Sequence, residues 1–138
     1  MEEIKRRLKA FKDARILYQK AKDESEQIAT LLTSAAIDYS KVKVQTSPHD
    51  FTDTMARLVD LHNECVKRMN ECVTAMEDAA RLIDLVEEPE LREILSRRYL
   101  RLDQWPDIAE VLKKDERWIY RLHERALQEI KQKIDFDQ

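Results

Sequence analysis

Residues 103–131 read DQWPDIAEVLKKDERWIYRLHERALQEIK and predict two short helices joined by a tight turn. Apolar side chains recur at steps of three and four on both sides of the turn, as they do on the buried face of a helix. Asp115 is well placed to cap the second helix, although the turn contains no glycine. We expect Ala109 to be the small residue at the crossing of the two helices. The other side chains expected to face inward are Ile108, Leu112, Ile119, Leu122, Ala126 and Ile130.

Two longer helices are predicted before this stretch. The first covers about residues 2–36, where apolar residues follow one helical face from Ile4 to Ala35. The segment SPHD then offers Ser47 as an N-cap and Pro48 as the first helical residue of the second. The apolar positions of that second helix alternate strictly by three and four, which is typical of a coiled-coil seam. They are Phe51, Met55, Leu58, His62, Cys65, Met69, Cys72, Met76, Ala79, Ile83 and Val86.

A second apolar line runs beside this seam through Val59, Val66, Val73 and Ala80. The apolar surface of the second helix is therefore wider than the contact surface of a single partner helix. Two interpretations remain open: the chain's own C-terminal helices cover the line, or it is a surface for self-association. We expect a homodimer held together by the long helices.

The composition favours helices throughout. The chain of 138 residues has no glycine and three prolines, so tight hairpin turns between strands are unlikely to form a large part of it. Pro89 opens a series of short helices, expected at about residues 89–101, 104–113 and 115–133. We therefore predict an all-α fold, with a long antiparallel helical hairpin in residues 1–87 and a small helix-turn-helix bundle in residues 88–138.

The face of the last helix that points away from the predicted core is rich in arginine. Residues 91–133 contain 11 basic and 8 acidic residues, whereas residues 1–90 contain 14 basic and 18 acidic. Arginine binds guanine edges in the major groove and also binds phosphates. A solvated helix face with local ion pairs is the alternative interpretation. The candidate DNA-binding residues are Lys113, Lys114, Glu116, Arg117, Tyr120, Arg121, Glu124 and Arg125.

The sequence shows no pattern typical of an enzyme. It lacks a glycine-rich phosphate loop, a His-Glu-x-x-His motif and an activated serine or cysteine, so we predict no catalytic residue and no cofactor. Cys65 and Cys72 lie about 10 Å apart along one helix, too far for a disulfide, and are expected to be reduced core thiols. His62 shares their face, but further metal ligands are missing, so no metal site is predicted.

The C-terminal stretch ILSRRYLRLDQWPDIAEVLKKDERWIYRLHERALQEI resembles the helix-turn-helix of sigma-70 region 4. It is more similar still to phage and prophage transcriptional regulators of the RinA and ArpU kind, whose V-Q-x-S-P segment between two long helices is similar to KVQTSP here. The chain differs from that family at Pro106, and at Lys113 and Glu124, where glycine is common. The matching residues are Arg98, Tyr99, Leu100, Trp105, Ile108, Ala109, Arg117, Trp118, Tyr120, Arg121, Leu122, His123, Ala126 and Leu127.

The resemblance implies a DNA-binding transcriptional regulator of phage or prophage genes that acts in the cytoplasm of a bacterial host cell. Double-stranded DNA is the expected partner, read in the major groove by the helix at residues 115–133. The alternative is an adaptor that binds RNA polymerase or another phage protein without reading DNA. No apolar run is long enough to cross a membrane, and Trp105 and Trp118 are expected to be structural.

Overall fold

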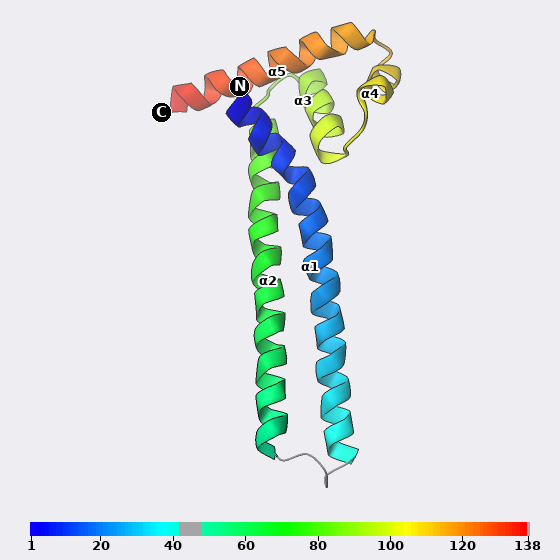
Figure 1. Cartoon of the computed structure of the whole chain (residues 1–138). Coiled ribbons are helices and arrows are strands. Elements are labelled where there is room, and N and C mark those ends of the chain that lie inside the picture. Colours follow the sequence, from blue (N-terminus) through cyan, green and yellow to red (C-terminus); the bar gives the residue numbers. More distant parts are fainter. Residues whose placement is uncertain (42–47, 138) are drawn as a thin grey trace. The chain divides into compact units, whose positions relative to one another are not determined.

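The computed structural model describes residues 1–41 and 48–137, and in these ranges the chain is all-α (Figure 1). Ser47, the predicted N-cap, lies outside the described residues. The all-α prediction is confirmed: no strand occurs in the described ranges. The elements are α1 (Glu2–Lys41), α2 (Pro48–Asp84), α3 (Pro89–Leu95), the π-helical turn η1 (Ser96–Leu100), α4 (Trp105–Leu112) and α5 (Glu116–Asp137).

The chain forms two compact units. One contains residues 16–73, and the other contains residues 1–15 and 74–138. This division differs from the boundary at residue 88 that the sequence suggested. The difference arises because the beginning of α1 and the end of α2 share a hydrophobic core with the short helices.

In the unit of residues 16–73, α1 and α2 run antiparallel. Glu24 accepts a hydrogen bond from Arg68 at 3.5 Å, and the Tyr39 ring stacks on Phe51 with centroids 3.9 Å apart. Ser25 is buried in a gap of the apolar pattern, and its hydroxyl donates to the Lys22 carbonyl at 2.7 Å. A polar residue therefore occupies the inner face of α1 between Ala21 and Ile28.

The seam of α2 is only partly covered in this unit. From residue 51 to residue 69, Cys65 is the one seam position that is buried, and its neighbours on the seam are half-buried. Val59 and Val66 are exposed within this unit, so α1 does not cover them. Cys65 and Cys72 are free and buried, as predicted.

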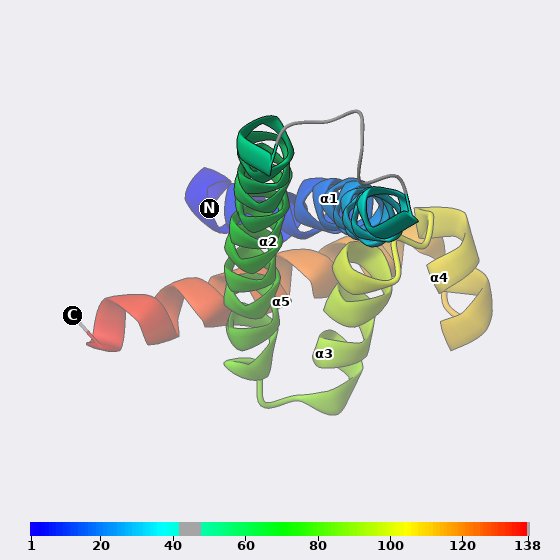
Figure 2. The same ribbon diagram turned by 90° about the horizontal axis from the view of Figure 1, so that it is seen from below.

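The second unit, which contains residues 1–15 and the chain from residue 74 onward, has one continuous hydrophobic core. Its buried members come from the beginning of α1, the end of α2, and every short helix. Figures 1 and 2 both show α3 and α4 lying against the N-terminal half of α5, and the contacts between these helices agree. At one edge of the core Arg7 donates to Asp78 in a paired arrangement, with Nε at 3.0 Å from Oδ2 and Nη2 at 2.6 Å from Oδ1.

The predicted helix-turn-helix residues pack as expected. Ile108, Ile119, Ala126 and Ile130 are fully buried, and the small residue Ala109 is 8% exposed. Asp115 caps α5 from the position before its first residue, because its side chain accepts a hydrogen bond from the Arg117 amide at 2.9 Å. The predicted helix at 89–101 is instead α3 followed by η1, and α5 extends four residues beyond the predicted end at 133.

The turn between α4 and α5 is left-handed at Lys113, with φ 55° and ψ 45°. Glycine usually occupies this conformation, because a side chain at positive φ crowds the backbone. The Lys113 amide donates to the Glu110 carbonyl and the Lys114 amide donates to the Ala109 carbonyl, so the end of α4 is closed by backbone hydrogen bonds. Lys113 therefore performs the role of the missing glycine.

Substitutions at Lys113 should follow the rule for left-handed residues. We expect Lys113→Gly to have a free energy of unfolding about 1–2 kcal/mol higher than that of Lys113→Val, because a β-branched residue is poorly tolerated at positive φ. Urea unfolding of both variants measures the difference. Lys131, exposed within α5, is the matched control and should give the opposite order, since glycine is the poorer helix former there. The same order at both positions would contradict this assignment.

Candidate nucleic-acid interface

The outer face of α5 is determined by the side chains on its inner face. Ile119, Leu122, Ala126, Leu127 and Ile130 are each at most 2% exposed, and they pack in the core with α3 and α4. A helix with one face held this firmly cannot rotate about its axis. The residues on the opposite face therefore have a fixed direction.

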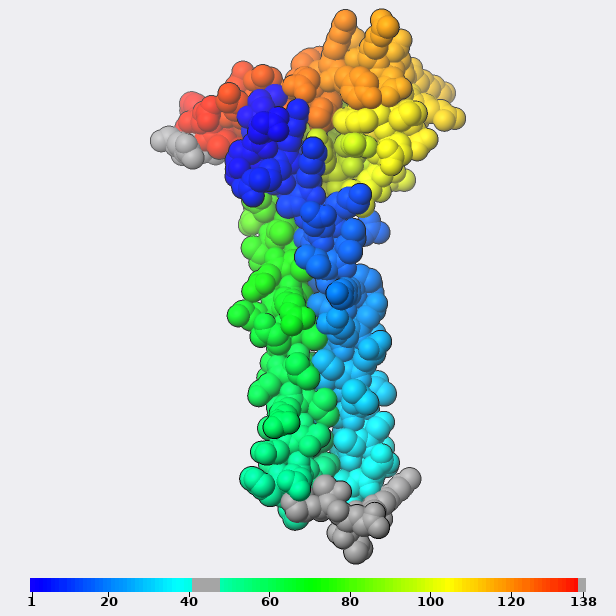
Figure 3. Space-filling view, in the orientation of Figure 1, coloured from blue at the N-terminus to red at the C-terminus, as the bar shows by residue number. Residues whose placement is uncertain are grey.

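Arg117 and Arg121 lie on this outer face and are exposed. In the part of the chain that the structure describes, neither guanidinium takes part in an ion pair. Their donors are available to a ligand outside the chain. Figure 3 shows that the first turns of α5, coloured orange, lie open at the surface with side chains projecting from it.

Among the other three basic candidates, Lys113 is exposed at the turn, whereas Lys114 and Arg125 already have partners. The Lys114 ammonium is 3.2 Å from Glu90 of α3, and Arg125 is 3.5 Å from Glu88. Both pairs are partly exposed, and such pairs contribute about 0–1 kcal/mol to stability. They therefore hold the two cations near α3 while leaving them able to change partner.

The other candidates, Glu116, Tyr120 and Glu124, also have partners within the chain. Glu124 is 3.7 Å from the Lys5 ammonium of α1, and the Tyr120 hydroxyl donates to Glu116 at 2.7 Å. The hydrogen bond to Glu116 raises the pKa of the Tyr120 hydroxyl. Lys5 thus balances the acidic charge of Glu124, which the sequence placed near the nucleic acid.

The two tryptophans have different environments. Trp105 packs against the core and contacts His123 and Tyr120 edge-on, with ring centroids 4.8 Å and 5.1 Å apart. This agrees with its predicted structural role. Trp118 was expected to be structural, but it is 43% exposed and is not part of the hydrophobic core. It lies on the flank of α5 beside the outer face, where the buried stripe does not reach.

Tyr99 and His123 form a buried polar pair that the sequence pattern did not indicate. The Tyr99 hydroxyl and His123 Nε2 share a hydrogen bond at 2.7 Å, and both residues are about 6% exposed. Burial, together with the charges of Lys5, Arg98 and Lys9, lowers the pKa of His123 to about 4. Burial also raises the pKa of Tyr99 to about 12. Both groups are neutral at pH 7, and the pair connects η1 to α5.

No group of three or more His, Cys, Asp or Glu side chains is arranged to hold a metal ion in the described ranges. In those ranges, no helix combines the length and the apolar character needed to cross a membrane.

The chain matches no known family model, no characterised protein and no solved structure.

The His123 environment predicts a specific pH dependence of stability. Because the folded-state pKa of His123 lies below its ordinary value of 6.5, its contribution is fully present above pH 6.5 and is lost as the pH falls toward 4. The free energy of unfolding should fall by up to about 3 kcal/mol over this window. Chemical unfolding at a series of pH values measures it.

The variant His123→Gln is the control for this prediction, because it keeps a hydrogen-bonding side chain that does not titrate. Its unfolding free energy should change much less between pH 6.5 and pH 4. Equal pH dependence in both proteins would show that other groups are responsible.

Proposed function

We propose that this protein is a sequence-specific DNA-binding transcriptional regulator of phage or prophage genes. The observation that supports it best is the outer face of α5, where Arg117 and Arg121 are exposed and form no ion pair in the described residues. Helix-turn-helix proteins place the N-terminal residues of such a helix in the major groove. The predicted pattern of buried residues, which fixes this face, is present in the structure.

The arginines are spaced to serve two purposes. Arg117, Arg121 and Arg125 are four residues apart and follow a stripe about 12 Å long. In the proposed mechanism Arg117 and Arg121, nearest the helix start, donate to base edges. Arg125, with Lys113 and Lys114 at the turn, donates to phosphates and sets the orientation of the helix.

An adaptor that binds RNA polymerase or another phage protein is the second candidate function. Exposed Trp118 and Val111 favour it, because aromatic and large apolar side chains are enriched in protein interfaces. Such an adaptor would not bind duplex DNA in a salt-dependent way. The two candidates therefore differ in a direct binding measurement.

We also propose that two copies associate through the valine line of α2. Val59 and Val66 are 44% and 38% exposed, and the seam beside them is only partly covered. Both valines follow a seam residue by one position, whereas Leu61 precedes one and so lies on the other side of the seam. That other side also carries the ion pair between Glu24 and Arg68, so the valine side is the more apolar.

DNA binding predicts different effects for different cations. Arg121→Ala should weaken binding to the preferred duplex by about 1–3 kcal/mol and relax the preference at one base position. Lys114→Ala should weaken binding to all duplexes alike. It should also reduce the slope of log affinity against log salt concentration by about one. Fluorescence anisotropy with duplexes from the protein's genomic neighbourhood and with random duplexes, at several salt concentrations, measures both effects.

Two further variants sharpen the comparison. Arg57→Ala removes an exposed arginine of α2 outside the predicted interface and should bind like the wild type. Glu90→Gln should strengthen binding, because Lys114 no longer has to leave its ion pair to meet a phosphate. Salt-independent binding, or equal effects of Arg121→Ala and Arg57→Ala, would favour the adaptor instead.

Self-association predicts a difference between the two sides of the α2 seam. The double variant Val59→Glu and Val66→Glu should be a monomer in light scattering at concentrations where the wild type is a dimer, because it places charges in an apolar interface. Leu61→Glu is the matched control, since Leu61 is 54% exposed on the same helix, and it should remain dimeric. A wild-type monomer would contradict the proposal.

A further inference from the structure

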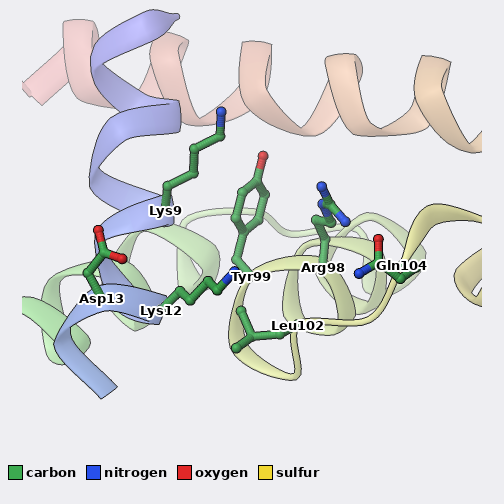
Figure 4. Close-up of a pocket in the computed structure, with 7 residues that line it drawn as sticks. All are labelled: Lys9, Lys12, Asp13, Arg98, Tyr99, Leu102 and Gln104. Carbon is green, nitrogen blue, oxygen red and sulfur yellow. The ribbon is translucent and has the colours of Figure 1, made fainter. Parts of the chain in front are cut away.

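A cavity of about 380 Å³ lies beside the Tyr99–His123 pair. Figure 4 shows its walls: α1 contributes Lys9, Lys12 and Asp13, and the opposite wall runs from Arg98 to Gln104. Cavities of this size are in the range that holds small ligands. Arg117 and Arg121 are not among the lining residues, so the cavity is distinct from the proposed DNA-reading face.

The charge of the cavity is positive. Three cations, Lys9, Lys12 and Arg98, line it together with one carboxylate, that of Asp13. Lys9 and Lys12 are exposed and form no ion pair in the described part of the chain. They lie three residues apart on one face of α1, where like charges repel each other. A bound anion would remove this repulsion.

Arg98 is held in position before any ligand binds. Its Nη1 donates to the Asp103 carbonyl at 3.2 Å, and its Cζ lies 4.6 Å from the centroid of the Trp105 ring. In Figure 4 the Lys9 and Arg98 side chains extend toward α5 on either side of Tyr99, and Gln104 lies beside Arg98. A guanidinium held in this way loses little side-chain entropy when it binds an oxyanion.

The backbone at the cavity wall is strained. Leu102 has φ 64°, a left-handed conformation that is unfavourable for leucine, and it follows the π-helical turn η1. Strained residues and π-helical turns are concentrated at functional sites. Beside this wall, the charges of Lys9 and Arg98 add to the effect of burial in lowering the pKa of His123.

We propose that this cavity binds the terminal phosphate of a small phosphorylated molecule. Lys9, Lys12 and Arg98 supply the cationic donors, and a terminal phosphate carries the double negative charge that suits three of them. Leu102 and the Gln104 amide line the part of the cavity that would receive the remainder of the ligand. The other source of the same chemistry is a phosphate of the DNA backbone, which carries a single charge.

The first experiment is an NMR titration of the full chain with sodium pyrophosphate, with sodium chloride at equal ionic strength as the reference. Saturable shifts are expected at the Arg98 Nε–H group and the His123 ring, and pyrophosphate should raise the pKa of His123. The double variant Lys9→Gln and Lys12→Gln should bind roughly tenfold more weakly or worse. Lys20→Gln, at an exposed lysine of α1 outside the cavity, is the matched control and should bind like the wild type.

The second experiment distinguishes the two sources of phosphate. Adenosine monophosphate should compete with pyrophosphate, whereas a duplex without terminal phosphates should leave the His123 signals unchanged. Competition by the duplex, together with a loss of duplex affinity in the double lysine variant, would overturn the small-molecule assignment. Absence of saturable shifts, or equal weakening by Lys20→Gln, would overturn the site itself. Neither result depends on whether Arg117 and Arg121 read DNA.

Discussion

The buried stripe of α5 is the constraint on which the arrangement of the second unit depends. Ile119, Leu122, Ala126 and Ile130 lie in one core with α3, α4 and the adjoining ends of α1 and α2. Burial of apolar surface at about 25 cal/mol per Å² makes this the dominant stabilising term of the unit. Because the stripe fixes which side of α5 is buried, it also fixes which side is presented outward. Arg117 and Arg121 are exposed on one side of α5 because the opposite side is buried in the core.

Polar contacts join the elements of this hydrophobic core and pair several of its surface charges. The Tyr99–His123 hydrogen bond joins η1 to α5 inside the core, and Arg98 covers the Trp105 ring beside it. Ion pairs of Lys114 with Glu90 and of Lys5 with Glu124 connect the outer residues to neighbouring helices. Each of these pairs is partly exposed and contributes little to stability. Their effect is to determine which cations of the surface are available to a ligand.

Much of this fold could be predicted from the sequence, because steps of three and four mark a buried helical face. The inner residues of α4 and α5, the Asp115 cap and the reduced cysteines all follow from local pattern. The exposure of Trp118 could not be predicted, because helical position shows that a residue lies on a flank but not whether another element covers it. The Tyr99–His123 pair depends on a contact between residues 24 apart in sequence, which periodicity does not encode. The cavity beside it was missed for the same reason, since its walls come from α1 and from η1 and the loop that follows it.

We propose that the outer face of α5 contacts DNA through Arg117 and Arg121. The most direct measurement is the NMR spectrum of the arginine Nε–H groups of the full chain, recorded with and without a duplex from the protein's genomic neighbourhood. We expect the signals of Arg117 and Arg121 to shift when the duplex is added, and the signal of Arg57 to stay unchanged. Shifts confined to other arginines, or no shift at any of them, would contradict it.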